Sequence, residues 1–329
     1  MEAPLVPPSH LEDDYTLQQR VPLASYYVDD SNKGQGSHYK FSAKYIERMI
    51  NHSIPEQLSI LQTKGFAPDE EEKASQEDFD SMFLQLLDKN YWPLVALWHM
   101  KSLLQGKKVA VFGSIDPYFE CVALYFGADL VTTFEYNELT FEHNQLHVVT
   151  SDRYKALIEA VEQDDLSQLD YARFSHFFDV ALSFSSFDHS GLGRYGDPLD
   201  PYGDLRAISF VRKLLKDDGI GQFVLSLPVG PDVTVWNLHR RYGTLRLPMC
   251  LAAFFYGAEA AIEGAVGANT AMEMSLGEEG EAESEELFYK HDVVIRHWPE
   301  VLRVGWYSFK LSQPAPFTQT YEPILIFYT

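Results

Sequence analysis

The sequence predicts a doubly wound α/β fold, in which a mostly parallel sheet carries helices on both faces. From Lys107 onward, apolar runs of strand length alternate with segments whose apolar residues recur at helical spacing. The runs are rich in valine and phenylalanine, and glycine or polar residues end most of them. Such alternation implies parallel strands joined by right-handed helical crossovers. The 329 residues, 46% of them hydrophobic, suffice for one large domain with additions or for two domains.

The N-terminal part, residues 1–104, is predicted to be an irregular and helical extension. Prolines interrupt residues 1–38, and the apolar spacing predicts helices at 39–51, 79–87 and 93–104. An acidic run at 69–80 lies between the first two of these helices and is typical of a solvated loop.

The remaining residues, 105–329, are predicted to form the sheet domain. Strands are expected at 107–114, 128–137, 146–152, 178–185 and 221–230, with late antiparallel strands at 304–311 and 321–329. Residues 235–245 are expected to be helical. A second acidic run makes an insertion near 276–287.

The composition argues against several classes of protein. A net charge of −22 disfavours a binder of the nucleic-acid backbone, which needs a basic patch or stripe. No window is long and apolar enough for a membrane span, and the N-terminus lacks the basic and apolar regions of a signal peptide. With Cys121 and Cys250 as its only cysteines, the chain suits a reducing compartment. A soluble, cytoplasmic protein is therefore expected.

The turn after the first predicted strand has features of a nucleotide site. Gly113 ends the strand where a ligand would approach the backbone, and Ser114 begins the turn. About 20 residues further on, Glu135 ends the second strand, where a carboxylate accepts hydrogen bonds from ribose hydroxyls. The alternative is that Gly113 makes a tight turn and Glu135 is a solvated strand end. Asp152, after the third strand, is placed either against an adenine amine or as a helix N-cap.

A long polar loop follows the fourth predicted strand, at residues 186–204. A simple connection takes about two to six residues, so the length of this one favours a functional loop. Open α/β sheets bind their ligands beyond the carboxyl ends of the strands. The residues expected to meet a cofactor there are the first of the loop, Ser186, Phe187, Asp188 and His189.

A specific sequence pattern spans three segments: FDVALSFSSFDHSGLGRYGDPLDPYGDL (178–205), VLSLPVGPD (224–232) and WNLHRRYGTLRLP (236–248). Together these segments resemble a family of uncharacterised proteins that is catalogued only as a domain of unknown function. That family is itself similar to class I S-adenosylmethionine-dependent methyltransferases. The resemblance covers residues 107–255.

The methyltransferase likeness implies a Rossmann-like sheet that binds S-adenosylmethionine. It makes VAVFGS (109–114) the first cofactor motif and Glu135 the ribose ligand, and it places Ser186, Phe187 and Asp188 beside the cofactor. The turn departs from the usual first motif, which has further glycines where Ser114, Ile115 and Asp116 stand.

Two histidines are candidates for the general base of methyl transfer to a hydroxyl. His189 is the first and His239 the second, because an imidazole titrates near neutral pH; the alternative is that each fixes a loop. The candidate substrate-binding residues are Arg194, Tyr195, Asp197, Asn237 and Arg240. Arginine suits a carboxylate or phosphate, but these arginines are alternatively partners of the loop's own aspartates, Asp197, Asp200 and Asp204. The spacing of these groups matches no metal-binding loop, so no metal is expected.

The sequence therefore favours an S-adenosylmethionine-dependent methyltransferase acting on a small-molecule or glycan-type hydroxyl or carboxyl acceptor. The alternative is a non-catalytic methyltransferase-like subunit that binds or assembles, with a protein partner on the N-terminal extension. A nicotinamide-dependent oxidoreductase also uses an acidic residue after the second strand, but the glycine fingerprint of that class is missing. A fold by itself does not separate these functions.

Overall fold

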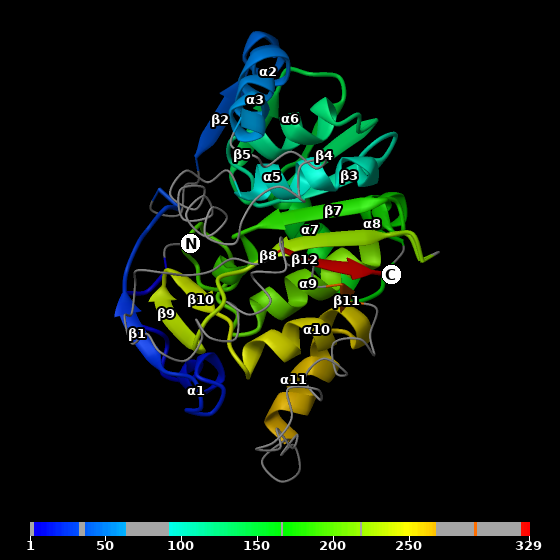
Figure 1. Cartoon of the computed structure of the whole chain (residues 1–329). Coiled ribbons are helices and arrows are strands. Elements are labelled where there is room, and N and C mark those ends of the chain that lie inside the picture. The colour runs from blue at the N-terminus through cyan, green and yellow to red at the C-terminus, as the bar shows by residue number, and fades with distance from the viewer. Residues whose placement is uncertain are drawn as a thin grey trace, which may run out of the picture.

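The structure, a computed structural model, is drawn in Figure 1. It describes residues 3–32, 37–63, 92–165, 167–217, 219–267, 293–294 and 324–329. Several predicted features lie outside the described residues: the helix at 79–87, the acidic runs at 69–80 and 276–287, and the strand at 304–311.

A seven-stranded sheet forms the centre of the molecule (Figure 1). Its strand order is β6 (Leu146–Val149), β4 (Leu130–Phe134), β3 (Lys108–Phe112), β7 (Val180–Phe184), β8 (Gln222–Ser226), β12 (Ile324–Tyr328) and β11 (Val293–Val294). The strands from β6 to β8 are parallel, and β12 pairs antiparallel with β8 and with β11. This order confirms the predicted doubly wound, mostly parallel, class I methyltransferase-like sheet. It reverses between β3 and β7, which makes that point the topological switch point.

Helices cover both faces of the sheet, because alternate residues of each strand point to opposite faces. Ala110 and Phe112 of β3 belong to the core under α7 (Ser151–Glu162), α8 (Leu169–Phe174), α9 (Gly203–Leu214), α10 (Arg246–Tyr256) and α11 (Ala258–Gly267). Val109 and Val111 belong to the core under α5 (Trp92–His99) and α6 (Tyr118–Tyr125). The pi-helical turn η1 (Met49–Ser53), between α2 (Ala43–Arg48) and α3 (Ile54–Thr63), packs on α6.

The first core is rich in aromatic rings. Phe112 and Phe134 stack with their ring centroids 4.9 Å apart, and Phe210 of α9 meets both at 6.2 Å. Each fully buried phenylalanine contributes roughly 1.5–3 kcal/mol by leaving water. These rings hold the ends of β3 and β4 against the helices, which fixes the two strand ends that lead into the candidate site.

A small second sheet lies beside the first and corrects one sequence prediction. The sequence predicts a helix at 235–245, but this segment contains the end of β9 (Val233–Asn237) and all of β10 (His239–Arg241), which pair antiparallel. The other edge of β9 pairs in parallel with β1 (Leu23–Tyr26). A partner so distant in sequence leaves no trace in the local pattern, although Val233, Val235 and Trp236 all favour a strand. A third sheet joins β2 (His38–Phe41) to β5 (Glu138–Phe141).

Residues 3–32, here called the N-terminal cover, pack over the loop at 186–204. The Tyr15 hydroxyl, at the end of the short helix α1 (Glu12–Tyr15), donates a hydrogen bond to the carbonyl oxygen of Gly191 at 2.7 Å. Trp236 Nε1 donates to the carbonyl oxygen of Pro4 at 3.1 Å, and its ring meets that of Tyr15 edge-on at 5.1 Å. The cover therefore fixes one side of the loop.

In the part of the chain that the structure describes, no helix is both long enough and apolar enough to cross a membrane. Cys121 and Cys250 are free thiols, and both are buried.

Candidate functional site

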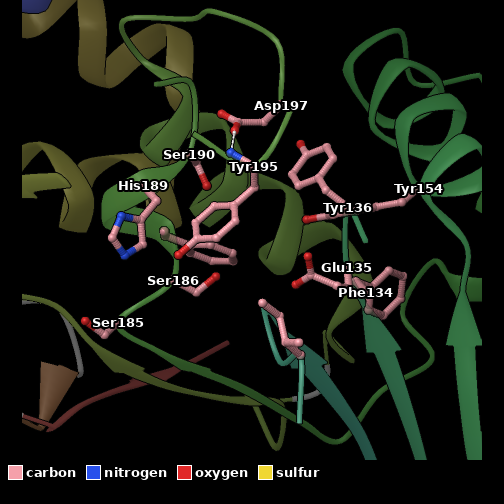
Figure 2. A pocket seen from close by; sticks show the side chains of 13 residues that line it. Phe134, Glu135, Tyr136, Tyr154, Ser185, Ser186, His189, Ser190, Tyr195 and Asp197 are labelled. Atoms are coloured by element: carbon pink, nitrogen blue, oxygen red, sulfur yellow. Dashed lines mark hydrogen bonds between the residues drawn. The ribbon is translucent and has the colours of Figure 1, made fainter. Parts of the chain in front are cut away.

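A cleft that is open to solvent lies at the switch point of the sheet (Figure 2). Ligands of doubly wound sheets bind at this place, beyond the carboxyl ends of the strands. It is lined by residues at or after the ends of β3, β4 and β7, by one residue of α7 and by residues of the loop: Gly113, Ile115, Phe134, Glu135, Tyr136, Tyr154, Ser185, Ser186, Phe187, His189, Ser190, Tyr195 and Asp197.

Gly113 is required at the end of β3 for two reasons. Its φ is +72°, a left-handed conformation in which a side chain is strained. A Cβ added at this position would also lie only 1.8 Å from Oγ of Ser186, which follows β7. The Ser186 side chain thus occupies the space directly over Gly113. It brings a hydroxyl into the cleft at the point where β3 and β7 diverge.

Glu135 places a carboxyl group in the cleft from the end of β4 (Figure 2). Oε1 accepts hydrogen bonds from the backbone N–H and from Nδ2 of Asn137, both at 3.0 Å. Burial raises the pKa of Glu135, these bonds oppose the rise, and the charge of Asp197 adds to it. A buried carboxylate in this state gains from any ligand that donates hydrogen bonds to it, such as a pair of ribose hydroxyls.

Aromatic rings form one wall of the cleft. Tyr136 follows Glu135 directly, and its ring lies 5.1 Å from that of Tyr154 on α7. Burial raises the pKa of both phenols, so each keeps its proton. Flat faces of this kind suit the stacking of a planar base. The sequence reading missed both tyrosines, although a tyrosine beside the acidic end of the second strand was a usable signal.

His189 lines the cleft at the other side, on the single turn η3 (Phe187–His189). Its Nδ1 contacts the carbonyl oxygen of Leu238, a hydrogen bond that requires the proton on Nδ1. The lone pair is then on Nε2, which lies 3.4 Å from Oδ2 of Asp188. Burial, and then the cation of Arg194, lower the pKa of His189 to about 4, so its ring is neutral at pH 7.

Asp188 lies behind His189 and is 1% exposed. Its Oδ1 has no hydrogen-bond partner among the described residues. Burial raises the pKa of Asp188 to about 7, against the lowering effect of Arg240 and Arg194. The Asp188 carboxyl can therefore hold or release a proton near neutral pH.

Asp197 and Tyr195 come from the middle of the loop. Asp197 accepts hydrogen bonds from the backbone N–H groups of Gly191 at 2.8 Å, Gly193 at 3.0 Å and Tyr195 at 3.2 Å. These three hydrogen bonds hold residues 191–197 together, and Tyr195 faces the cleft (Figure 2). The Tyr195 ring meets that of His189 edge-on at 5.6 Å.

Arg194 lies just behind this wall and does not line the cleft. Its guanidinium lies over the ring of Tyr195, 4.9 Å from the centroid, and its Nε is 2.6 Å from Oδ2 of Asp30 in the N-terminal cover. The arginine therefore links the cover to the cleft wall.

Five further residues singled out in the sequence also lie outside the lining of the cleft: Ser114, Asp152, Asn237, His239 and Arg240. Asp152 is exposed in the first turn of α7, whose N-cap is Thr150. Ser114 Oγ lies 3.0 Å from Oε2 of Glu120, a buried carboxyl that the sequence reading missed. Asn237 Oδ1 accepts from the backbone N–H of Val28 at 2.8 Å. The His239 ring stands behind His189, with centroids 6.4 Å apart.

Arg240 is fully buried and turned toward the protein. It donates to the carbonyl oxygens of Ser190, Asp200 and Pro201 at 2.5, 3.2 and 3.2 Å. Its neighbour Arg246, on α10, makes a bidentate ion pair with Asp204. Nε donates to Oδ2 at 2.8 Å and Nη2 donates to Oδ1 at 2.7 Å. These arginines hold the far end of the loop in place. Within the described residues, no three His, Cys, Asp or Glu side chains come together in a way that could hold a metal ion.

Comparison with known proteins gives one family. The family model described as "Caenorhabditis protein of unknown function, DUF268" matches residues 106–296, which is more than half of the chain. The chain belongs to the DUF268 family. The match contains β3, β4, β7 and the loop at 186–204, so this DUF268 protein carries its cleft within the family region. No curated protein sequence matches the chain.

Solved structures similar to this DUF268 protein include two methyltransferases. An S-adenosylmethionine-dependent methyltransferase from Mesorhizobium loti is 17% identical, with a TM-score of 0.26, over 40% of this chain and 53% of that one. The chain thus spans about half the length of that protein. The 1,6-didemethyltoxoflavin-N1-methyltransferase of Burkholderia thailandensis, solved with 1,6-didemethyltoxoflavin and S-adenosylhomocysteine, is 15% identical, with a TM-score of 0.31, over 55% and 79%. The fold assignment rests on the strand order given above and not on these distant likenesses.

Proposed function

We propose that the cleft binds S-adenosylmethionine and that the protein transfers its methyl group to a small-molecule or glycan-type hydroxyl. The observation that carries this proposal is the Glu135 carboxyl, which enters a cleft at the switch point from the end of the second strand of the sheet. That position suits the ribose hydroxyls of an adenosyl cofactor, with Tyr136 and Tyr154 beside the base. Ser186, whose side chain lies over Gly113, would contact the rest of the cofactor.

The residues around the cleft suit the cofactor, which supplies a methyl group on a positively charged sulfur. Alignment is the main requirement for such a transfer, together with a base when the acceptor is a hydroxyl. His189 is the candidate base for the proton of the acceptor hydroxyl, and Asp188, whose Oδ2 lies 3.4 Å from Nε2 of His189, would stabilise the imidazolium. A hydroxyl suits the cleft better than a carboxylate, because Glu135 and Asp197 would repel a second anion.

Calorimetry on the whole protein tests the proposal at its first step. S-adenosylmethionine or S-adenosylhomocysteine should bind, and Glu135→Ala should weaken binding by at least about tenfold, since a hydrogen bond to a charged group is worth roughly 1.5–3 kcal/mol. Glu138→Ala is the matched control, because Glu138 is exposed on β5 and outside the cleft. No binding of either compound at millimolar concentration would refute the proposal.

A second experiment separates an enzyme from a binding subunit. Transfer of a labelled methyl group should be measured over a panel of hydroxyl compounds, with His189→Gln alongside. The variant should bind the cofactor as the wild type does and lose at least about a hundredfold in kcat, the usual contribution of a general base. Cofactor binding without methyl transfer to any acceptor of the panel would favour the non-catalytic alternative.

A further inference from the structure

The residues that line the cleft include acidic side chains but no cationic ones. Among its thirteen residues, the carboxyl groups of Glu135 and Asp197 are the acidic ones, and no lysine or arginine lines it. His189 does not compensate them, because its ring is neutral at pH 7. The described part of the cleft therefore has negative but no positive side chains.

The nearby cations are turned away from this space. Arg194 is engaged by Asp30 at 2.6 Å, and its Nη1 lies 3.4 Å from the Leu238 carbonyl oxygen. Arg240 is directed to the carbonyl oxygens behind the loop. Each cation is thus engaged by a protein partner, and neither lines the cleft.

The two carboxyl groups carry an electrostatic cost that a ligand can relieve. Burial raises the pKa of both, and the charge of Asp197 is among the causes that raise the pKa of Glu135. A buried carboxylate of this kind is stabilised by a cation placed in the same low-dielectric space. The aromatic wall acts in the same direction, because the rings of Tyr136 and Tyr154 attract a cation over their faces.

We infer that the cleft selects its adenosyl ligand by charge, and that it binds the sulfonium cofactor S-adenosylmethionine more tightly than the neutral thioether product S-adenosylhomocysteine. This inference rests on the proposed function. The two compounds share the same base, ribose and amino-acid tail, so their difference in affinity isolates the charge on sulfur. A consequence is that the product leaves readily and inhibits the protein weakly.

The test is calorimetry on the whole wild-type protein with three probes: S-adenosylmethionine, S-adenosylhomocysteine and sinefungin. Sinefungin carries an ammonium group in place of the sulfonium. The thioether should bind at least about tenfold more weakly than the sulfonium, which corresponds to roughly 1.4 kcal/mol of charge and cation–π interaction. Sinefungin should bind more like the sulfonium compound. Equal or tighter binding of S-adenosylhomocysteine would overturn the inference and leave the proposed function standing, whereas no binding of any probe would refute the proposed function itself.

A variant tests whether the charge of Glu135 causes the preference for S-adenosylmethionine over S-adenosylhomocysteine. Glu135→Gln keeps the shape of the side chain and removes its charge, so the ratio of the two dissociation constants should fall toward one even though both ligands bind more weakly. Glu138→Gln, on the exposed face of β5, should leave the ratio as in the wild type. A ratio that stays at its wild-type value in Glu135→Gln would overturn the role given to this carboxylate. Should Glu135→Gln fail to fold, the order of the three probes on the wild type still decides.

Discussion

Asp188 and Asp204 lie at opposite ends of the same loop and differ in how many partners their carboxyl groups have. Both are buried, with exposures of 1% and 0%. Asp204 receives two bonds from Arg246 and one from the Tyr242 hydroxyl at 3.0 Å. Asp188 has an oxygen with no hydrogen-bond partner among the described residues and a neutral histidine at 3.4 Å.

The pKa values follow the same division. Burial alone would raise the pKa of Asp204, but Arg240 and Arg246 outweigh it and lower the pKa to about 2. The cations are too weakly coupled to Asp188 to do the same, and burial raises its pKa to about 7. The carboxylate of Asp204, at the C-terminal end of the loop, is therefore stabilised by its partners. The carboxylate of Asp188, at the N-terminal end, is costly to bury in its charged form. Uncompensated groups of this kind gather at functional sites.

The largest expected effect comes from removing the compensation of Asp204. Arg246→Met removes both charge-assisted hydrogen bonds from the buried Asp204 carboxylate and leaves it only the Tyr242 hydroxyl and the more distant Arg240, whose Nε is 3.9 Å away. We expect the variant to lower the free energy of unfolding by about 3–5 kcal/mol. Arg153→Met is the matched control, because Arg153 makes the same kind of bidentate ion pair with Asp170, at 2.9 and 2.6 Å, on the exposed surface. It should cost less than about 1 kcal/mol. Denaturant titrations measure both, and equal losses would contradict a special role for burial.

The next effect concerns the turn that carries the cleft. Gly113→Ala strains the backbone and overlaps Oγ of Ser186, so we expect a loss of about 2–4 kcal/mol in thermal or denaturant unfolding. In the double variant Gly113→Ala with Ser186→Gly, the overlap is relieved and only the strain remains. Recovery of about half the loss is expected, and a double variant no more stable than Gly113→Ala would argue against the contact.

Asp188→Asn should have a smaller effect, and of opposite sign. The folded pKa of about 7 lies above the value of an unfolded aspartate, so ionised Asp188 destabilises the folded state above pH 7. The neutral amide avoids that cost, and the variant should be more stable than the wild type by at least about 1 kcal/mol at pH 8. The gain should shrink as the pH falls from about 7 to about 4, since wild-type Asp188 is then protonated in the fold. A gain that does not change with pH would contradict the assignment.

The smallest effect is expected at the link between the cover and the cleft. Arg194 pairs with Asp30, whose side chain is 39% exposed, so Arg194→Met should cost less than about 1 kcal/mol. Loss of that cation should at the same time raise the pKa of His189, which titration by nuclear magnetic resonance can follow. A His189 pKa that stays at the wild-type value would show that burial alone sets it.

Much of the fold follows from the sequence because strands β3, β4, β7 and β8 are short apolar runs with clear ends. Their order then places Gly113, Glu135 and Ser186 at one edge of the sheet, and the cleft is found there. The pairing of β9 with β1 and β10 could not be predicted in this way. Its pairing with β1 depends on residues that are far apart in the chain.

Within the loop, residue type did not show which side chains face the cleft. Arg240 and Asp188 carry groups typical of active sites, yet neither lines the cleft. The direction of Arg240 is set by contacts with distant segments, such as its hydrogen bonds to Asp200 and Pro201. Tyr154 was missed for the converse reason, since an apolar position on a helix gives no sign of the cleft beside it.

The N-terminal cover supplies contacts that a truncated form of this protein would lack. A fragment that starts at residue 105 keeps the seven strands of the central sheet, but it loses β1, the partner of β9, and Tyr15, the partner of Gly191. It would expose the Trp236 ring and an unpaired strand edge, which promotes association between chains. We therefore expect the smallest stable unit of this fold to include the N-terminal cover, whose strand β1 pairs with β9, more than half the chain away in sequence. Pairings between such distant segments slow folding, because loop-closure entropy is lost before the contact forms.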